Sequence, residues 1–179
     1  MIYMFLADGF EEIEALCPLD LFRRAELAVT TVGVGKKQIT GAHGITVCAD
    51  ISDTEFSDAD LEMIFLPGGM PGTLNLAESK VVMDALAYAS DNKKYIAAIC
   101  AAPSILGDCG LLRGKSAVCY PGFEDRLTGA TIPEGKVVVD GRVITAKGMG
   151  AALEMGLEIV KIFRGEKYAD ELRHAVIAD

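Results

Sequence analysis

The sequence predicts a doubly wound α/β domain, in which a mostly parallel sheet carries helices on both faces. Short apolar runs alternate with helical segments along the chain, which is the order typical of parallel α/β proteins. No repeat, low-complexity tract or linker interrupts this alternation. With 179 residues, 51% of them hydrophobic, the chain is long enough for one well-filled core and short for two. We therefore expect residues 1–179 to form a single domain.

The expected elements follow from the apolar periodicity. Strands are expected at residues 2–7, 29–34, 63–66, 95–99 and 116–118, and helices at residues 11–25, 151–163 and 166–176, with two more that reach Ser90 and Leu112. Two hairpins are also expected. The arm 38–48 turns at Gly41–Gly44, and residues 137–139 pair with 143–145 across Asp140–Gly141. Glycine favours such turns because it readily adopts the positive φ that they need.

The charge balance excludes two classes of partner. A net charge of −9 and a pI near 4.7 have the wrong sign for binding nucleic acid or an anionic membrane. No apolar stretch reaches the ~18 residues of a membrane span, and the N-terminus lacks the basic start of a leader. We expect a soluble cytoplasmic protein. Its five Cys are odd in number and form no CxxC pair, so neither disulfides nor a metal site is predicted.

Cys100 stands where an apolar strand, YIAAI at 95–99, meets the small residues Ala101 and Ala102 and then Pro103. Proline fits the first turn of a helix, where its missing N–H is harmless. A sulfur at a helix N-terminus experiences partial positive charge, which lowers the pKa of a thiol and favours the nucleophilic thiolate. The sequence therefore predicts a reactive Cys100, and the alternative is a buried Cys that only packs.

Three carboxylates, Glu11, Glu12 and Glu14, lie near the start of the helix expected at 11–25. For Glu11 and Glu12 we expect a solvated face that complements the helix dipole. Glu14 differs because it lies four residues before Pro18, whose ring and missing N–H disturb the bond to the residue 14 carbonyl. A carboxyl group held there near a thiol would stay protonated near neutral pH and act as a general acid or base.

Gly68 and Gly69 follow the strand at 63–66, and sites of doubly wound sheets form at the carboxyl ends of strands. Glycine lets backbone N–H groups approach a bound atom closely, as in an oxyanion hole, and the Ala101 N–H offers a second donor. The alternative is a simple tight turn. The segment lacks the Lys-Ser/Thr and GxGxxG patterns of phosphate loops, so nucleotide binding is not expected.

Three motifs occur in a distinctive order and spacing: GFEEIEA at 9–15, LPGG at 66–69 and AAICAAP at 97–103. Together they resemble the ThiJ/PfpI superfamily, and within it the parkinsonism-associated protein deglycase branch. The likeness covers essentially the whole chain, including ITVCAD at 45–50 and ITAKGMG at 144–150.

The resemblance implies a flavodoxin-like three-layer α/β/α sandwich that forms a homodimer. It also implies that Cys100 is the nucleophile and that Glu14 is its protonated acid/base partner. Gly69 and Ala101 would supply the backbone oxyanion contacts, with Gly68 beside them.

The sequence departs from the family pattern at informative positions. Peptidase-like members carry a His directly after the nucleophile, whereas this chain has Ala101, which argues against a Cys peptidase. Many deglycase-branch members carry a His where this chain has Tyr120, and a phenol with a pKa near ~10 is a poor base at neutral pH. Tyr120 is therefore expected to bind substrate, which leaves proton transfer to Glu14. His43 would reach the partner's site in the family dimer, or else is an exposed turn residue.

The other cysteines, Cys17, Cys48, Cys109 and Cys119, lack the strand-to-helix setting, so packing is expected for each. Cys119 is the best candidate for a second reactive thiol because it adjoins Tyr120. Met149 either lines the pocket or packs at a helix start.

These residues predict a cofactor-independent enzyme of the glyoxalase or deglycase kind, acting on α-oxoaldehydes such as methylglyoxal or on their early adducts. Cys100 would add to the aldehyde and Glu14 would shuttle protons, giving a hydroxy acid. The alternative is a redox sensor or stress-protective protein in which Cys100 is oxidised to a sulfinate. A Cys peptidase is the third hypothesis, disfavoured by Ala101.

Overall fold

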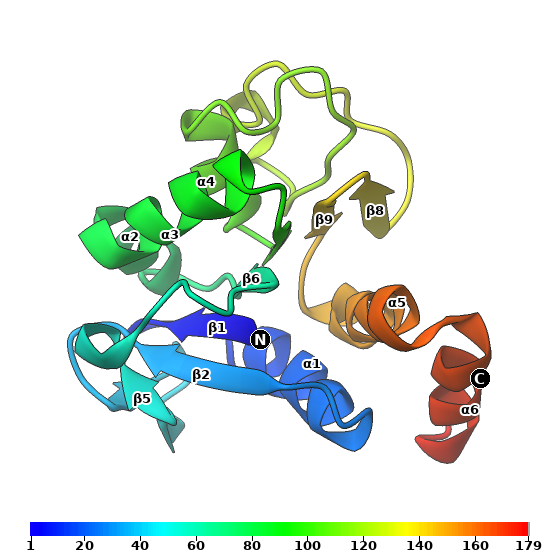
Figure 1. Ribbon diagram of the computed structural model, residues 1–179. Coiled ribbons are helices and arrows are strands. Elements are labelled where there is room, and N and C mark those ends of the chain that lie inside the picture. The colour runs from blue at the N-terminus through cyan, green and yellow to red at the C-terminus, as the bar shows by residue number, and fades with distance from the viewer. Residues whose placement is uncertain (179) are drawn as a thin grey trace.

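The computed structural model describes residues 1–178 and has a seven-stranded sheet at its centre, in the order β5-β2-β1-β6-β7-β9-β8 (Figure 1). The strands are β1 (Ile2–Leu6), β2 (Val29–Gly33), β5 (Ile51–Ser52), β6 (Met63–Leu66), β7 (Tyr95–Ile99), β8 (Val137–Asp140) and β9 (Val143–Ala146). Neighbouring strands are parallel except β8, which is antiparallel to β9. The predicted α/β class is confirmed.

Helices cover both faces of the sheet, and Figure 1 shows α2, α3 and α4 on one side with α1 and α5 on the other. The helices are α1 (Glu12–Arg24), α2 (Gly72–Glu78), α3 (Lys80–Asp91), α4 (Pro103–Asp108), α5 (Ala152–Arg164) and α6 (Glu166–Ala175). Each face has its own apolar core. Phe22 of α1 meets Phe65 of β6 edge-on in one core, with ring centroids 5.9 Å apart. Strands covered on both faces read as continuous apolar runs, which explains β1, β6 and β7.

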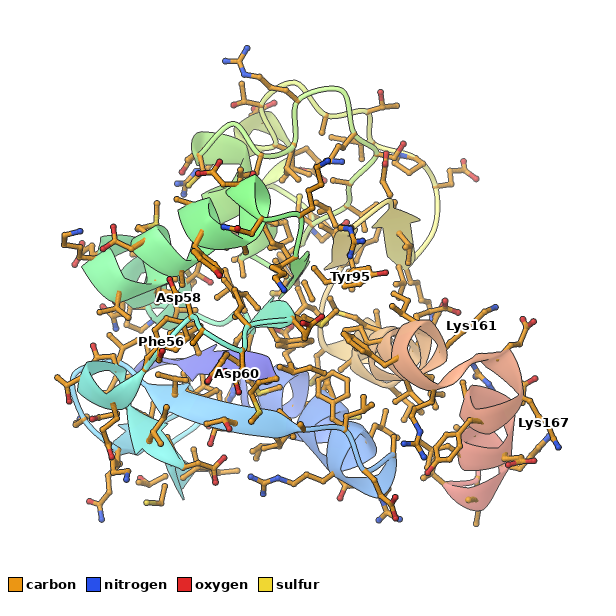
Figure 2. All side chains as sticks on the ribbon, viewed as in Figure 1. Phe56, Asp58, Asp60, Tyr95, Lys161 and Lys167 are labelled. Carbon is orange, nitrogen blue, oxygen red and sulfur yellow. The ribbon has the colours of Figure 1, made fainter. Side chains whose placement is uncertain are left out.

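The two predicted hairpins are present. β3 (Gln38–Thr40) pairs with β4 (Thr46–Cys48) as a separate antiparallel arm, and β8 pairs with β9 across the turn at Gly141. Side chains fill the spaces between the layers (Figure 2). No helix within residues 1–178 combines the length and the apolar character that crossing a membrane requires.

Three expectations for the elements were wrong in detail. The helix expected up to Ser90 is two helices, because Ser79 is extended and accepts a hydrogen bond from the Val82 N–H at 3.4 Å, capping α3. The helix expected to reach Leu112 ends at Asp108, because Gly110 adopts a left-handed φ of 73° there.

The third error concerns the strand expected at residues 116–118, which is reduced to one bridge between Ser116 and Thr131. β9 already pairs with β7 and β8, so neither edge is free to accept another strand. The Val118 N–H instead donates to the Thr145 hydroxyl at 3.0 Å. The short strand β5, which pairs with β2 at the sheet edge, was not predicted.

Candidate active site

Three chain segments meet at the carboxyl edge of the parallel strands. Cys100 follows β7, Gly68 and Gly69 follow β6, and Glu14 comes from the first turn of α1. They open into a cleft of about 330 Å³. Its walls are formed by Glu11, Glu14, His43, Gly69, Met70, Cys100, Ala101, Tyr120, Phe123 and Met149. The structure therefore brings the predicted site residues to one place.

Cys100 occupies a strained turn between β7 and α4. Its φ of 65° is left-handed, a conformation that costs a non-glycine residue about 1–2 kcal/mol. Backbone hydrogen bonds hold it on both sides. The Cys100 N–H donates to the Ala146 carbonyl at 2.9 Å, and the Cys100 carbonyl accepts from the Tyr120 N–H at 2.8 Å. This strain is imposed by the surrounding fold, which fixes the direction of the sulfur into the cleft.

Glu14 is 1% exposed and lies against Cys100. Its Oε2 accepts the Gly68 N–H at 3.0 Å, and its carboxyl group is also hydrogen-bonded to the Cys100 thiol and the Met149 N–H. Burial raises the pKa of Glu14 to about 7, although these three hydrogen bonds favour the carboxylate. α1 runs through Pro18 without a break, so the helix supports this position despite the proline.

The predicted lowering of the Cys100 pKa was wrong. Burial and the neighbouring Glu14 carboxylate raise the pKa of the thiol to about 12, while the N–H groups of Gly69 and Ala101 lower it. Helix α4 has only six residues, so its dipole does not offset these two effects. The two side chains titrate as a pair, because a charge on one disfavours a charge on the other. The pair therefore retains one proton across the neutral and mildly alkaline range.

Gly68 and Gly69 are required by close packing. A Cβ on Gly68 would lie 2.6 Å from the Cys100 Cβ and 2.7 Å from Glu14 Oε2. The Gly68 N–H donates to Glu14, so Gly68 positions the acid and its N–H is not a free oxyanion donor. Gly69 has a left-handed φ of 89°, and its N–H approaches the sulfur together with that of Ala101. Both predicted oxyanion donors therefore lie beside the sulfur, and their role toward a bound oxygen stays a prediction.

The outer wall is largely apolar. Tyr120 and Met149 are about half exposed and line the cleft. This position agrees with the expectation that Tyr120 lies at the substrate site. Met70 and Phe123 also line it and were not predicted. The position of Met70 directly after Gly69 is the one signal that points to it, whereas Phe123 lies in an irregular segment without a motif.

The expectation that Glu12 lies on a solvated face of the helix was wrong. Glu12 is buried, and its Oε1 accepts the N–H groups of His43 at 2.9 Å and Ile45 at 3.3 Å, which ties α1 to the β3–β4 arm. His43 Nδ1 lies 3.1 Å from Glu12 Oε2, and this hydrogen bond raises the pKa of His43. His43 thus stands at the rim of its own cleft. Within residues 1–178, Glu11, Glu12 and His43 are the cluster whose spacing would suit a metal ion.

The remaining thiols differ in setting. Cys119 is 3% exposed, and burial together with Glu124 raises its pKa to about 11, which disfavours the thiolate. Unlike Cys100, Cys119 is not among the residues that line the cleft, so it is poorly placed to be a second reactive thiol. Cys48 and Cys109 are exposed, and Cys17 is partly buried on α1. All five thiols are free.

This arrangement can perform one kind of chemistry well. A sulfur beside a carboxyl group that exchanges a proton near neutral pH can add to an electrophilic carbon while the acid takes the thiol proton. The N–H groups of Gly69 and Ala101 can stabilise negative charge next to that sulfur.

Comparisons with known proteins agree with the site. Residues 1–162 match the sequence model of the DJ-1/PfpI family. A Parkinson disease protein 7 homolog from Danio rerio is 34% identical over 177 residues, which cover 96% of this chain and 94% of the relative. A deglycase from Pyrococcus abyssi is 32% identical over 161 residues, or 88% of this chain and 96% of the relative.

Solved structures show the same fold. Oxidized DJ-1 from Toxoplasma gondii superimposes with a TM-score of 0.94 at 30% identity, over 98% of this chain and 97% of the other. DJ-1beta from Drosophila melanogaster gives a TM-score of 0.93 at 30% identity, over 98% and 96% of the two chains. The flavodoxin-like sandwich and the resemblance drawn from the three motifs are confirmed, and the chain belongs to the DJ-1/PfpI family.

Proposed function

We propose that this protein is a cysteine-dependent glyoxalase or deglycase, which converts α-oxoaldehydes such as methylglyoxal, or their early adducts with amines and thiols, into 2-hydroxy acids. The observation that carries the proposal is the buried Glu14 carboxyl group hydrogen-bonded to the Cys100 thiol. The name of the Pyrococcus abyssi relative, a deglycase, supports the same class.

The first step forms a bond between the Cys100 sulfur and the aldehyde carbon. Glu14, as carboxylate, takes the thiol proton and passes it to the former aldehyde oxygen, which gives a hemithioacetal and restores the carboxylate. A state in which the Cys100 thiolate and the Glu14 carboxylate are both charged is disfavoured. The proton therefore moves from the sulfur to Glu14 as the sulfur attacks. The N–H groups of Gly69 and Ala101 lie where they favour the negative sulfur and the adjacent oxygen.

The second step moves hydrogen within the substrate. Glu14 removes the proton from the carbon bound to sulfur and returns it to the neighbouring carbonyl carbon through an enediol. The hydroxyl proton of the first carbon passes to the ketone oxygen, which leaves a thioester of a 2-hydroxy acid. Water then hydrolyses the thioester and regenerates the Cys100 thiol. The aldehyde carbon is oxidised and the ketone carbon is reduced, so electrons balance within the substrate and no external oxidant or cofactor is required.

The test measures product rather than loss of methylglyoxal, because lysine and arginine side chains also consume the aldehyde. Reduced protein is incubated with methylglyoxal, and D- and L-lactate are measured with enantiospecific dehydrogenases. We expect one enantiomer in excess from wild type and none from Cys100→Ala. Cys109→Ala, which removes an exposed thiol outside the cleft, is the matched control and should retain activity. Equal lactate from wild type and Cys100→Ala would contradict the proposal.

A redox role is the second candidate, favoured by the same two N–H groups, because Gly69 and Ala101 can also stabilise a Cys100 sulfinate. A solved relative from Toxoplasma gondii is described as oxidized. A protonated Glu14 would donate to the sulfinate, and glutamine would retain a donor there. We expect peroxide to give a stable Cys100 sulfinate in Glu14→Gln, detected by mass mapping, if this role holds. Over-oxidation or no oxidation at Cys100 would count against it.

We also propose that the chain forms a homodimer through an exposed apolar surface near the cleft. Ile13 and Cys17 lie one turn apart on α1, and Cys17 lines a groove together with Leu153 of α5. Ile13 is 49% exposed, and Ile45 on the arm is 54% exposed and lies near the start of α1, since its N–H donates to Glu12. A two-fold contact here would place the arm turn with His43 next to the partner.

A further inference from the structure

A second cavity adjoins the cleft around Cys100. This adjoining cavity has a volume of about 410 Å³ and shares Tyr120 and Met149 with the Cys100 cleft. Together the two spaces are far larger than a three-carbon aldehyde requires. Clefts of this combined size are typical of sites for larger small molecules.

The walls of the adjoining cavity are largely apolar, and two lysines are among the residues that line it. Tyr120, Pro121 and Met149 supply apolar surface, and Lys136 and Lys147 also line the cavity, so their ammonium groups are within reach of its rim. The backbone joins the two lysines, because the Lys147 N–H donates to the Lys136 carbonyl at 2.9 Å. The two positions are therefore fixed relative to each other.

Neither lysine forms an ion pair among the described residues. The lysines that do form ion pairs within residues 1–178 are Lys36, Lys37, Lys80, Lys94, Lys115, Lys161 and Lys167. In a protein of net charge −9, two lysines that form no ion pair among the described residues place positive charge beside the reactive cleft. They would attract an anionic group and hold it away from the sulfur.

Two glycines flank Met149 at the junction. A Cβ on Gly148 would contact the Tyr120 ring at 3.4 Å and lie 3.7 Å from Glu14 Oε1, so a side chain at Gly148 would narrow the junction. Gly150 has no atom within 4 Å of its Cβ position, so open space lies beside Gly150 in the adjoining cavity.

We propose that the adjoining cavity is a subsite for the body of an anionic adduct, in which an α-oxoaldehyde is bound to a thiol or amine that carries a carboxylate or phosphate. This inference rests on the proposed function and narrows its substrate class. The reactive carbon lies at Cys100, the short chain of the adduct rests on Tyr120 and Met149, and its anion pairs with Lys136 and Lys147.

The chemistry of such an adduct balances at the same groups. The bond from the aldehyde carbon to the sulfur or nitrogen of the adduct breaks as the bond to the Cys100 sulfur forms. The Cys100 thiol proton passes through Glu14 to the departing sulfur or nitrogen, which leaves as a thiol or amine. The remaining hemithioacetal then follows the steps described above.

The experiment compares two methylglyoxal hemithioacetals at equal free methylglyoxal. One is formed with 3-mercaptopropionate, which is anionic, and the other with 2-mercaptoethanol, which is neutral and of similar reach. We expect kcat/KM to be roughly fivefold higher for the anionic adduct, which is the upper range for an exposed ion pair, with the difference in KM rather than kcat. This preference should fall to about one in the double variant Lys136→Gln/Lys147→Gln.

The matched control is Lys167→Gln, which removes a lysine that is 92% exposed on α6, labelled in Figure 2, and should keep the preference. Binding is also measured without turnover, by titrating Cys100→Ala with 3-(methylthio)propionate and following the amide signals of residues 147–151. Shifts there that vanish in the double lysine variant support the subsite. Equal kcat/KM for the two adducts, or a preference that survives the double variant, would overturn the proposed subsite. Lactate formation from free methylglyoxal tests the proposed function separately, because it needs no anionic adduct.

Discussion

Replacing Glu14 with glutamine should stabilise this protein above neutral pH. The folded state holds the Glu14 proton more tightly than the unfolded chain, because burial raises the pKa of Glu14 from 4.5 to about 7. Below pH 4.5 Glu14 is protonated in both the folded and the unfolded state, so its burial costs no folding stability through ionisation. As pH rises from 4.5 to 7 the unfolded state releases its proton first, so folding stability falls, and the loss is complete above pH 7.

The size of this effect follows from the same values. Each pKa unit corresponds to about 1.4 kcal/mol, so burying the ionised Glu14 costs about 3 kcal/mol above pH 7. Glutamine has nearly the same shape, and its amide oxygen can still accept the Gly68 N–H, but it cannot ionise. The stability of Glu14→Gln relative to wild type should therefore improve by about 3 kcal/mol between pH 4 and pH 8.

Urea unfolding of both proteins under reducing conditions at several pH values measures this difference directly. Taking the difference between variant and wild type cancels the titration of all other groups to first order. Glu55→Gln provides a control of opposite sign, because hydrogen bonds from Ser52 lower the pKa of Glu55 and its contribution is lost as pH falls. A stability difference for Glu14→Gln that stays constant from pH 4 to pH 8 would refute the claim that burial keeps Glu14 protonated.

Three further predictions concern activity and assembly. In wild type, kcat/KM for methylglyoxal should rise as pH increases through about 7 and then stay level, because the Glu14 carboxylate must be free to take the Cys100 proton; a rate that falls over this range would contradict that role. Gly68→Ala should lose about 1–3 kcal/mol of stability and most lactate formation because its Cβ overlaps the site, whereas Gly150→Ala, with open space around its Cβ, should retain both in urea unfolding and lactate assays. Sedimentation should give a dimer for wild type and a lighter species for Ile45→Asp, and a monomeric wild type would remove the proposed interface.

The order of elements and the location of the site could be predicted because each rests on local signals. Apolar runs covered on both faces gave β1, β6 and β7, and the carboxyl ends of parallel strands must share one edge. Cys100 and Gly69 follow β7 and β6 directly, so their meeting follows from the topology. Glu14 joins them because α1 begins soon after β1 ends at the same edge.

The errors share a different cause, which is that they depend on contacts distant in sequence. Glu12 is two residues from Glu14 and was expected in solvent, but the arm folds back and surrounds it with the N–H groups of His43 and Ile45. Phe123 enters the cleft from a loop that carries no periodicity. The strand expected after residue 115 failed because β9 had no free edge.

The pKa of Cys100 illustrates this limit most clearly and also shows how the site is balanced. A helix start after a thiol predicts a lowered pKa from local sequence alone, yet the sulfur lies beside a buried acid that comes from residue 14. The charged thiolate is disfavoured unless Glu14 holds the proton, and the charged carboxylate is disfavoured by the same burial. Near pH 7 the Cys100 thiol is therefore protonated, and the Glu14 carboxyl group is close to its pKa. The pair therefore keeps the proton on the sulfur until the sulfur attacks, and Glu14, whose pKa lies near neutral pH, can take the proton as the new bond forms.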